Sequence, residues 1–185
     1  KTPTRLAMAS FTFPSMYSMP PFFTLQPVLD TRAKQCEVWC SLILDYCRHK
    51  KLVELRIRDA MASELFNNQQ IKRRLSPEAV QFFLDALVSR GNAEWVDKSK
   101  ERILIYWRAI GEWASIIYKY ICDQALQDSI CTVYELREGE NVEKQDFYEL
   151  DERVFMKAIR VLENEGKAKI FQGSNADSLG VKFFS

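Results

Sequence analysis

The chain has 185 residues, of which 47% are hydrophobic, and its 26 basic and 25 acidic side chains leave a formal net charge of +1. This composition is typical of a globular protein, and its charge balance gives no overall field that would attract nucleic acid or an anionic membrane. The sequence contains no apolar run near the roughly 18 residues of a membrane span, and it shows no signal-peptide pattern.

The segment up to residue 27 is rich in proline and aromatic residues. Four prolines exclude a regular helix and favour an extended, partly polyproline-II path: Pro14, Pro20, Pro21 and Pro27. Disordered tails are normally poor in aromatic residues, so the rings of this segment predict that it docks in a groove on a partner or on the chain's own first domain. Residues 1–27 are therefore predicted to form a separate docking segment on which neither domain core depends.

Residues 28–108 have the order of elements of a winged-helix domain. We expect a helix over residues 30–50, capped by Asp30 or Thr31. Residues 52–57 are expected to form a short strand or the entry to a second helix, and residues 58–67 are expected to be helical. Ser76 followed by Pro77 is a strong start signal for a third helix, which should end at Gly91. Two strands over 92–97 and 102–107 then complete a wing.

Residues 109–185 repeat this pattern at a spacing of about 75 residues. The stretch from Ser76 to Gly91 matches Asp151 to Gly166, and Trp39 corresponds to Trp113. Helices are expected over 111–127, 144–150 and 151–165, with strands over 131–136, 167–172 and 181–184. The sequence thus predicts an α+β, mainly helical fold of two tandem winged-helix domains preceded by the extended segment, and a duplicated module favours a scaffold or adaptor.

The five cysteines are odd in number and do not suggest a disulfide framework. Cys36, Cys40 and Cys47 share one helical stripe with Trp39 and Ile43, which is the face that a helix buries. We therefore expect reduced thiols in the core rather than a metal site with His49, and no metal or cofactor is expected.

The chain carries no recognisable catalytic residues, because it has one histidine, no Gly-x-Ser-x-Gly elbow and no glycine-rich phosphate loop. The third helices, 76–90 and 151–165, each carry a net charge of −1, whereas a DNA-reading helix needs a positive face. Only Lys72 to Arg74 and the wing around Lys98, Lys100 and Arg102 are basic. We expect no direct nucleic-acid binding, although a winged-helix transcription factor or a scaffold subunit of another multiprotein assembly remain alternatives.

A set of motifs extends along the chain from Met8 to the C-terminus, and the set is far more specific than any one of its members. The motifs are Phe13-Pro14, Tyr17, Pro20 to Pro27, Asp30 to Arg32, Gln35, Leu65 to Asn68, Gly91-Asn92, Glu94-Trp95, Asp97 to Lys100, Trp107-Arg108, Glu112-Trp113, Tyr134 to Leu136 and Gly180 to Phe184. This set resembles one family, the vacuolar protein sorting 25 subunits of the ESCRT-II complex.

The resemblance implies two tandem winged-helix domains and a non-catalytic role. Two copies of the subunit would form the arms of a Y-shaped complex, with the vacuolar protein sorting 22 and 36 subunits as its stem. The stem would bind the N-terminal segment, through Phe13, Pro14, Tyr17, Pro20, Pro21, Phe22 and Phe23. Ser15 and Met19 stand where the family has bulkier aromatic residues.

The resemblance also assigns a second surface, on the second domain. The ESCRT-III subunit vacuolar protein sorting 20 would bind there, around Thr132, Val133 and Tyr134. The chain would thus link the ESCRT-II core to ESCRT-III in multivesicular body sorting of ubiquitinated cargo. It would be cytoplasmic and recruited to the endosomal membrane indirectly, through its partners.

Overall fold

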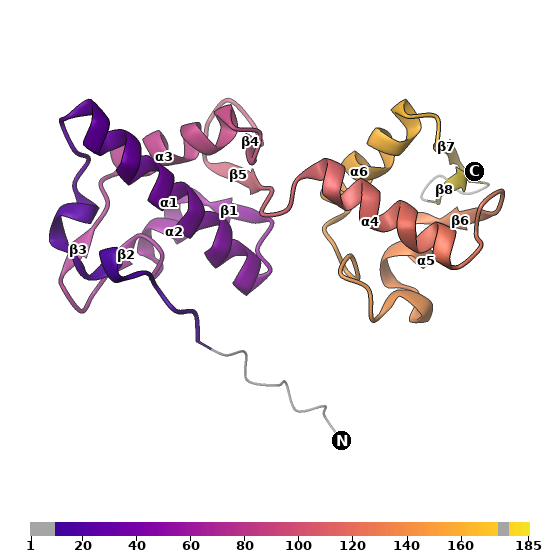
Figure 1. Ribbon diagram of the computed structural model, residues 1–185, viewed down its shortest axis with the longest axis horizontal. Helices are drawn as coiled ribbons and strands as arrows, with labels where there is room; N and C mark the ends of the chain where they lie inside the picture. The colour runs from indigo at the N-terminus through magenta and orange to yellow at the C-terminus, as the bar shows by residue number, and fades with distance from the viewer. Residues whose placement is uncertain (1–9, 174–177) are drawn as a thin grey trace, which may run out of the picture. The chain divides into compact units, whose positions relative to one another are not determined.

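The computed structural model describes residues 10–173 and 178–185, and the chain divides into two compact units. Unit 1 extends to Trp107, and unit 2 extends from Arg108 to Ser185. Each unit combines helices with a three-stranded antiparallel sheet. Figure 1 shows the elements of unit 1 in indigo through magenta to pink, and those of unit 2 in salmon through orange to yellow.

Unit 1 begins with two short 3-10 helices and continues in the winged-helix order. Its sheet has the strand order β1-β5-β4, and a two-stranded hairpin, β2-β3, lies before the third helix. The elements are η1 (Ser15–Ser18), η2 (Pro20–Phe23), α1 (Leu29–Lys50), β1 (Glu54–Arg56), α2 (Ile57–Ala62), β2 (Asn67–Asn68), β3 (Arg73–Arg74), α3 (Pro77–Ser89), β4 (Ala93–Trp95) and β5 (Arg102–Ile105).

Unit 2 has the same strand connectivity, with the order β6-β8-β7. Its elements are α4 (Ile110–Asp123), β6 (Ile130–Thr132), α5 (Val133–Glu138), η3 (Glu140–Val142), α6 (Glu152–Asn164), β7 (Ala168–Gln172) and β8 (Leu179–Phe183). Residues 174–177, in the predicted wing loop, lie outside the described residues. The predicted fold class, α+β with two tandem winged helices, is confirmed.

The backbone at the end of the third helix repeats at the spacing seen in the sequence. Gly91 and Gly166 both have a left-handed conformation, with φ of 75° and 74°. The next amide donates back into the helix in both units, from Asn92 to Leu87 over 2.9 Å and from Lys167 to Leu162 over 2.8 Å. This is the hydrogen-bond pattern of a glycine-terminated helix, so both glycines are required to turn the chain into the wing.

Three local predictions were wrong. The helix α1 begins at Leu29, and its N-cap Val28 provides no side-chain hydrogen bond, so neither Asp30 nor Thr31 is the cap. A strand was predicted over residues 131–136, but the observed strand, β6, ends at Thr132. Thr132 and Glu135 form a reciprocal capping box there, which starts α5. Residues 144–150 form turns rather than a helix, since α5 already occupies the second-helix position.

The stripe of cysteines lies in the core of unit 1, as predicted. Cys36, Cys40 and Cys47 are buried along α1, and burial raises the pKa of the Cys47 thiol to about 12. Cys36 Sγ and Cys40 Sγ are 3.9 Å apart, which is far longer than a disulfide bond. The Cys47 thiol is therefore a protonated packing group at neutral pH.

The N-terminal segment departs most from its prediction. Instead of the predicted extended, partly polyproline-II path it makes two 3-10 turns, η1 and η2, separated by the extended residue Met19. Phe22 and Phe23 are each only 4% exposed and belong to the hydrophobic core of unit 1. The expectation that neither core depends on these rings is therefore wrong, because both turn inward.

This packing predicts that Phe22→Ala lowers the free energy of unfolding of unit 1 by about 3–5 kcal/mol, the usual cost of removing a buried phenylalanine ring. Pro20→Ala is the matched control, since Pro20 is exposed, and it should change stability by less than about 1 kcal/mol. Urea unfolding followed by tryptophan fluorescence measures both. Equal stabilities for the two variants would show that the ring is not part of the core.

Candidate partner-binding surfaces

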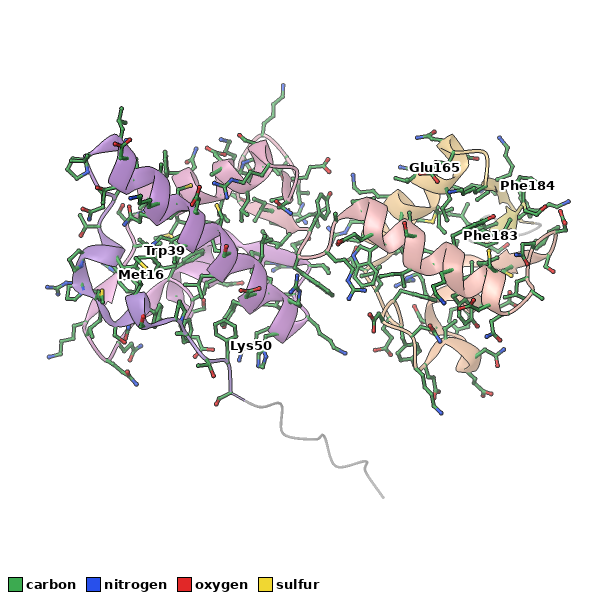
Figure 2. All side chains as sticks on the ribbon, in the orientation of Figure 1. Met16, Trp39, Lys50, Glu165, Phe183 and Phe184 are labelled. Atoms are coloured by element: carbon green, nitrogen blue, oxygen red, sulfur yellow. The ribbon has the colours of Figure 1, made fainter. Side chains whose placement is uncertain are left out.

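The predicted stem-binding residues divide into an inward and an outward group. Phe22 stacks on the indole of Trp39, with ring centroids 4.4 Å apart and an interplanar angle of 5°. Phe23 meets the same indole edge-on at 5.5 Å. Trp39 is fully buried within unit 1, where Figure 2 labels it on α1. A single indole from the long helix thus holds both rings of the motif.

Polar side chains of α1 fix the backbone of η2. Trp39 Nε1 donates to the carbonyl oxygen of Phe22 over 2.9 Å, and Gln35 Nε2 donates to the carbonyls of Phe22 and Thr24 over 3.0 and 2.8 Å. The amide of Gln26 donates to Gln35 Oε1 over 3.1 Å. Gln35 is 4% exposed, so these bonds also satisfy a buried amide. The motif is consequently preorganised before any partner arrives.

Tyr17 anchors the upstream turn. Its ring is buried and stacks on Phe13 at 3.9 Å, and its hydroxyl donates to the carbonyl oxygen of Glu64. Burial, with a smaller contribution from the charge of Glu64, raises the pKa of Tyr17 to about 12, so the hydroxyl stays protonated as a donor. Asn68 Nδ2, from β2, donates to the carbonyl of Tyr17 over 2.8 Å. The hairpin therefore supports η1.

Several proline and methionine side chains of the segment face solvent. Pro14, Pro20 and Pro21 are exposed, and they are joined by Met16 and Met19, which are 37% and 53% exposed. Figure 2 labels Met16 on η1. Met16 was not among the predicted contacts, and Met19 was noted only as a departure from the family's aromatic residue, because nothing in their spacing distinguishes the outward side of an irregular segment. The exposed residues form what we call the proline-methionine face: Pro14, Met16, Met19, Pro20 and Pro21.

The second predicted surface lies at the β6–α5 corner of unit 2. Thr132 is the N-cap of α5, where its hydroxyl accepts from the amide of Glu135 over 3.1 Å. Val133 is 5% exposed and belongs to the core, whereas Tyr134 is 66% exposed. Ile130, which the sequence analysis missed, is 63% exposed on β6. Of the three predicted residues only Tyr134 is available as a large contact.

Charged side chains of the third helix and the wing of unit 1 neutralise each other's charge by forming ion pairs. Lys100 Nζ lies 3.0 Å from Asp85 Oδ1 on α3, and Trp95 Nε1 donates to the same oxygen over 2.8 Å. Burial alone would raise the pKa of Asp85, but the bonds from Lys100 and Trp95 hold it below its usual value. Arg102 lies 3.7 Å from Asp97. These wing cations are partnered within the domain, which does not favour DNA phosphate as their ligand.

Two kinds of feature are absent from the part of the chain that the structure describes. Across residues 10–173 and 178–185 no three His, Cys, Asp or Glu side chains form a group that could hold a metal ion. Within the same residues no helix is both long and apolar enough to cross a membrane.

Comparison with known proteins identifies the family. The model of the family described as ESCRT-II complex subunit matches residues 16–151. The chain is 45% identical over 175 residues to vacuolar protein-sorting-associated protein 25 of Danio rerio, covering 95% of this chain and 99% of that protein.

Solved structures agree. A crystal structure of subunit VPS25 of the endosomal trafficking complex ESCRT-II matches with a TM-score of 0.81 and 27% identity, over 92% of this chain and 97% of that one. A chain of the crystal structure of endosomal complex ESCRT-II, VPS22/VPS25/VPS36, matches with a TM-score of 0.76 and 26% identity, over 90% and 96%. The resemblance to a non-catalytic trafficking subunit is confirmed, and the chain belongs to the family of ESCRT-II complex subunits.

Proposed function

We propose that this chain links the core of an ESCRT-II complex to ESCRT-III, using one surface on each unit. The observation that carries the proposal is the division of the N-terminal motif, in which buried rings hold an exposed proline-methionine face. The solved complex that contains VPS22 and VPS36 beside VPS25 supports the vacuolar protein sorting 22 and 36 subunits as the stem. The proposed ESCRT-III partner is the vacuolar protein sorting 20 subunit, which the sequence resemblance implies.

The stem contact uses the proline-methionine face rather than the phenylalanine rings. Pro20 and Pro21 lose little conformational freedom on docking, and the backbone beside them is already fixed by Gln35 and Trp39. Met16 and Met19 have unbranched side chains that fit irregular apolar grooves. Phe13, Tyr17, Phe22 and Phe23 then contribute by holding the face in shape.

The ESCRT-III contact uses Tyr134 together with Ile130. Two large apolar side chains exposed above 60% on one corner are suited to receive the apolar face of a helix. Thr132 and Val133 act as supports, because the capping box and the buried valine fix the start of α5.

We further propose that residues 1–27 act as the docking segment, 28–108 as the first winged-helix domain and 109–185 as the second. Two copies of the chain join one stem, so that each complex presents two ESCRT-III surfaces. The chain acts in the cytoplasm and reaches the endosomal membrane through its partners. A winged-helix transcription factor is disfavoured by the partnered wing cations and the net charge of −1 on α3 together with its flanking Ser76 and Arg90.

For the stem contact, the triple variant Met19→Ser/Pro20→Ser/Pro21→Ser should lose at least about tenfold in affinity for the purified stem subunits, because it removes the exposed apolar contacts. Its unfolding curve should match that of the original chain, since all three residues are exposed. Pro27→Ser, also exposed, is the control and should bind normally. Isothermal titration calorimetry measures the affinities, and unchanged binding by the triple variant would contradict the assignment.

For the ESCRT-III contact, Ile130→Ser/Tyr134→Ser should weaken binding of the first helix of the vacuolar protein sorting 20 subunit by at least about tenfold while stem binding stays normal. The control Glu143→Ser changes another exposed side chain of unit 2 and should affect neither partner. Fluorescence anisotropy with a labelled helix peptide reads the first affinity. Loss of stem binding, or full retention of the peptide, would refute the placement of this surface.

A further inference from the structure

One cluster of charged side chains is explained neither by the fold nor by the two proposed partner-binding surfaces. Beside α2 the structure has a hollow of about 730 Å3, lined by residues from β1, α2 and the wing of unit 1. Its charged lining comprises four cations and two acids: Arg56, Arg58, Lys100, Arg102, Asp59 and Glu101. The sequence alone showed the wing as basic, but the fold brings the two arginines of the β1–α2 junction beside it.

The four cationic side chains differ in whether they already have an ion-pair partner within the protein. Lys100 is bonded to Asp85, and Arg102 lies within 4.0 Å of Glu54 and Asp97. Arg56 and Arg58 are exposed, and among the described residues neither has a side-chain hydrogen bond or an ion pair. Two guanidinium groups therefore remain available to carboxylates at the rim of a hollow, and Arg binds carboxylates with well-defined geometry.

The hollow continues into an apolar neighbour. A second hollow of about 320 Å3 shares Arg56 and Asp59 with the first. Its remaining lining is mostly apolar, with Tyr46, Leu52, Leu55, Ala60 and Leu65, and it includes Ser63 and Glu54, whose carboxylate lies 4.0 Å from Arg102. Leu52 is 36% exposed at its mouth. Basic and apolar recesses thus lie next to each other along one short helix, α2. Such a pair fits a ligand that offers carboxylates and one apolar side chain within a few residues.

From this arrangement we propose that the α2 groove, made of these two hollows, binds an acidic peptide segment with an apolar residue beside its carboxylates, supplied by a partner protein. Charge complementarity selects the carboxylates, and the apolar recess selects the neighbouring side chain. The recess favours a peptide over a membrane surface or nucleic acid, because a planar bilayer cannot enter it and phosphates alone would leave it empty. The groove is separate from both surfaces assigned above.

The test uses the full isotopically labelled chain and a synthetic probe peptide of six glutamates around a central leucine and phenylalanine. Nuclear magnetic resonance titration should shift amides of residues 52–61 and 100–102, and the shifts should vanish as NaCl is raised to about 1 M. Arg56→Glu/Arg58→Glu should weaken binding by at least about tenfold. Lys34→Glu/Arg90→Glu changes the net charge equally at exposed positions of unit 1 outside the groove, and should weaken it less than about twofold.

Further experiments distinguish between the possible classes of ligand. A peptide with alanine in place of leucine and phenylalanine should bind more weakly than the probe, and phosphatidylserine vesicles or single-stranded DNA should not displace the probe. Stem subunits added to the labelled chain should leave the groove resonances in place. The proposal is overturned if the probe shifts residues 72–74 instead, if vesicles or DNA compete effectively, if the alanine peptide binds equally, or if the stem subunits occupy the groove.

Discussion

The stacking of Phe22 on Trp39 is the interaction on which the rest of unit 1 depends. The indole lies at the middle of α1, contacts Phe22, Phe23 and Phe83 through ring faces and edges, and donates its N–H to the backbone of η2. A buried indole needs both apolar neighbours and an acceptor for its nitrogen, and the N-terminal segment supplies both. The segment is therefore part of the fold rather than an appendage to it.

In the proposed docking segment, this constraint means that some side chains hold the segment in shape and others are left to contact a partner. The largest side chains of the segment, such as Phe22 and Phe23, are buried in the core of unit 1. The exposed residues that remain for a partner are prolines, which are smaller and more rigid, and methionines, which are more adaptable. Fixing the segment in advance reduces the conformational entropy that docking would otherwise cost. Unit 2 divides its surface in the same manner, since Val133 is buried to fix α5 while the adjacent Tyr134 is exposed.

Much of the fold could be predicted from the sequence alone, at positions where a local residue pattern is compatible with only one backbone structure. Ser76-Pro77 and Gly91 fixed α3, and the repeat at a spacing of 75 carried the same pattern to α6. The strand predicted over 131–136 extends past the start of α5, because the capping signature of Thr132 and Glu135 stands beside the β-branched residues Ile130 and Val133. The inward turn of Phe22 and Phe23 depends on Trp39 and Gln35, and no spacing along an irregular segment reports such a tertiary contact.

The central claim is that Phe22 stays in its own core while Met19 meets the stem. Fluorine resonance spectra test it directly, with 4-fluorophenylalanine at position 22 in one sample and trifluoromethionine at position 19 in another. On addition of the stem subunits, the resonance at position 19 should shift and broaden, while that at position 22 keeps its chemical shift beside the indole of Trp39. A large shift at position 22 with none at position 19 would contradict the account, because it would mean that the ring leaves the core to become the anchor.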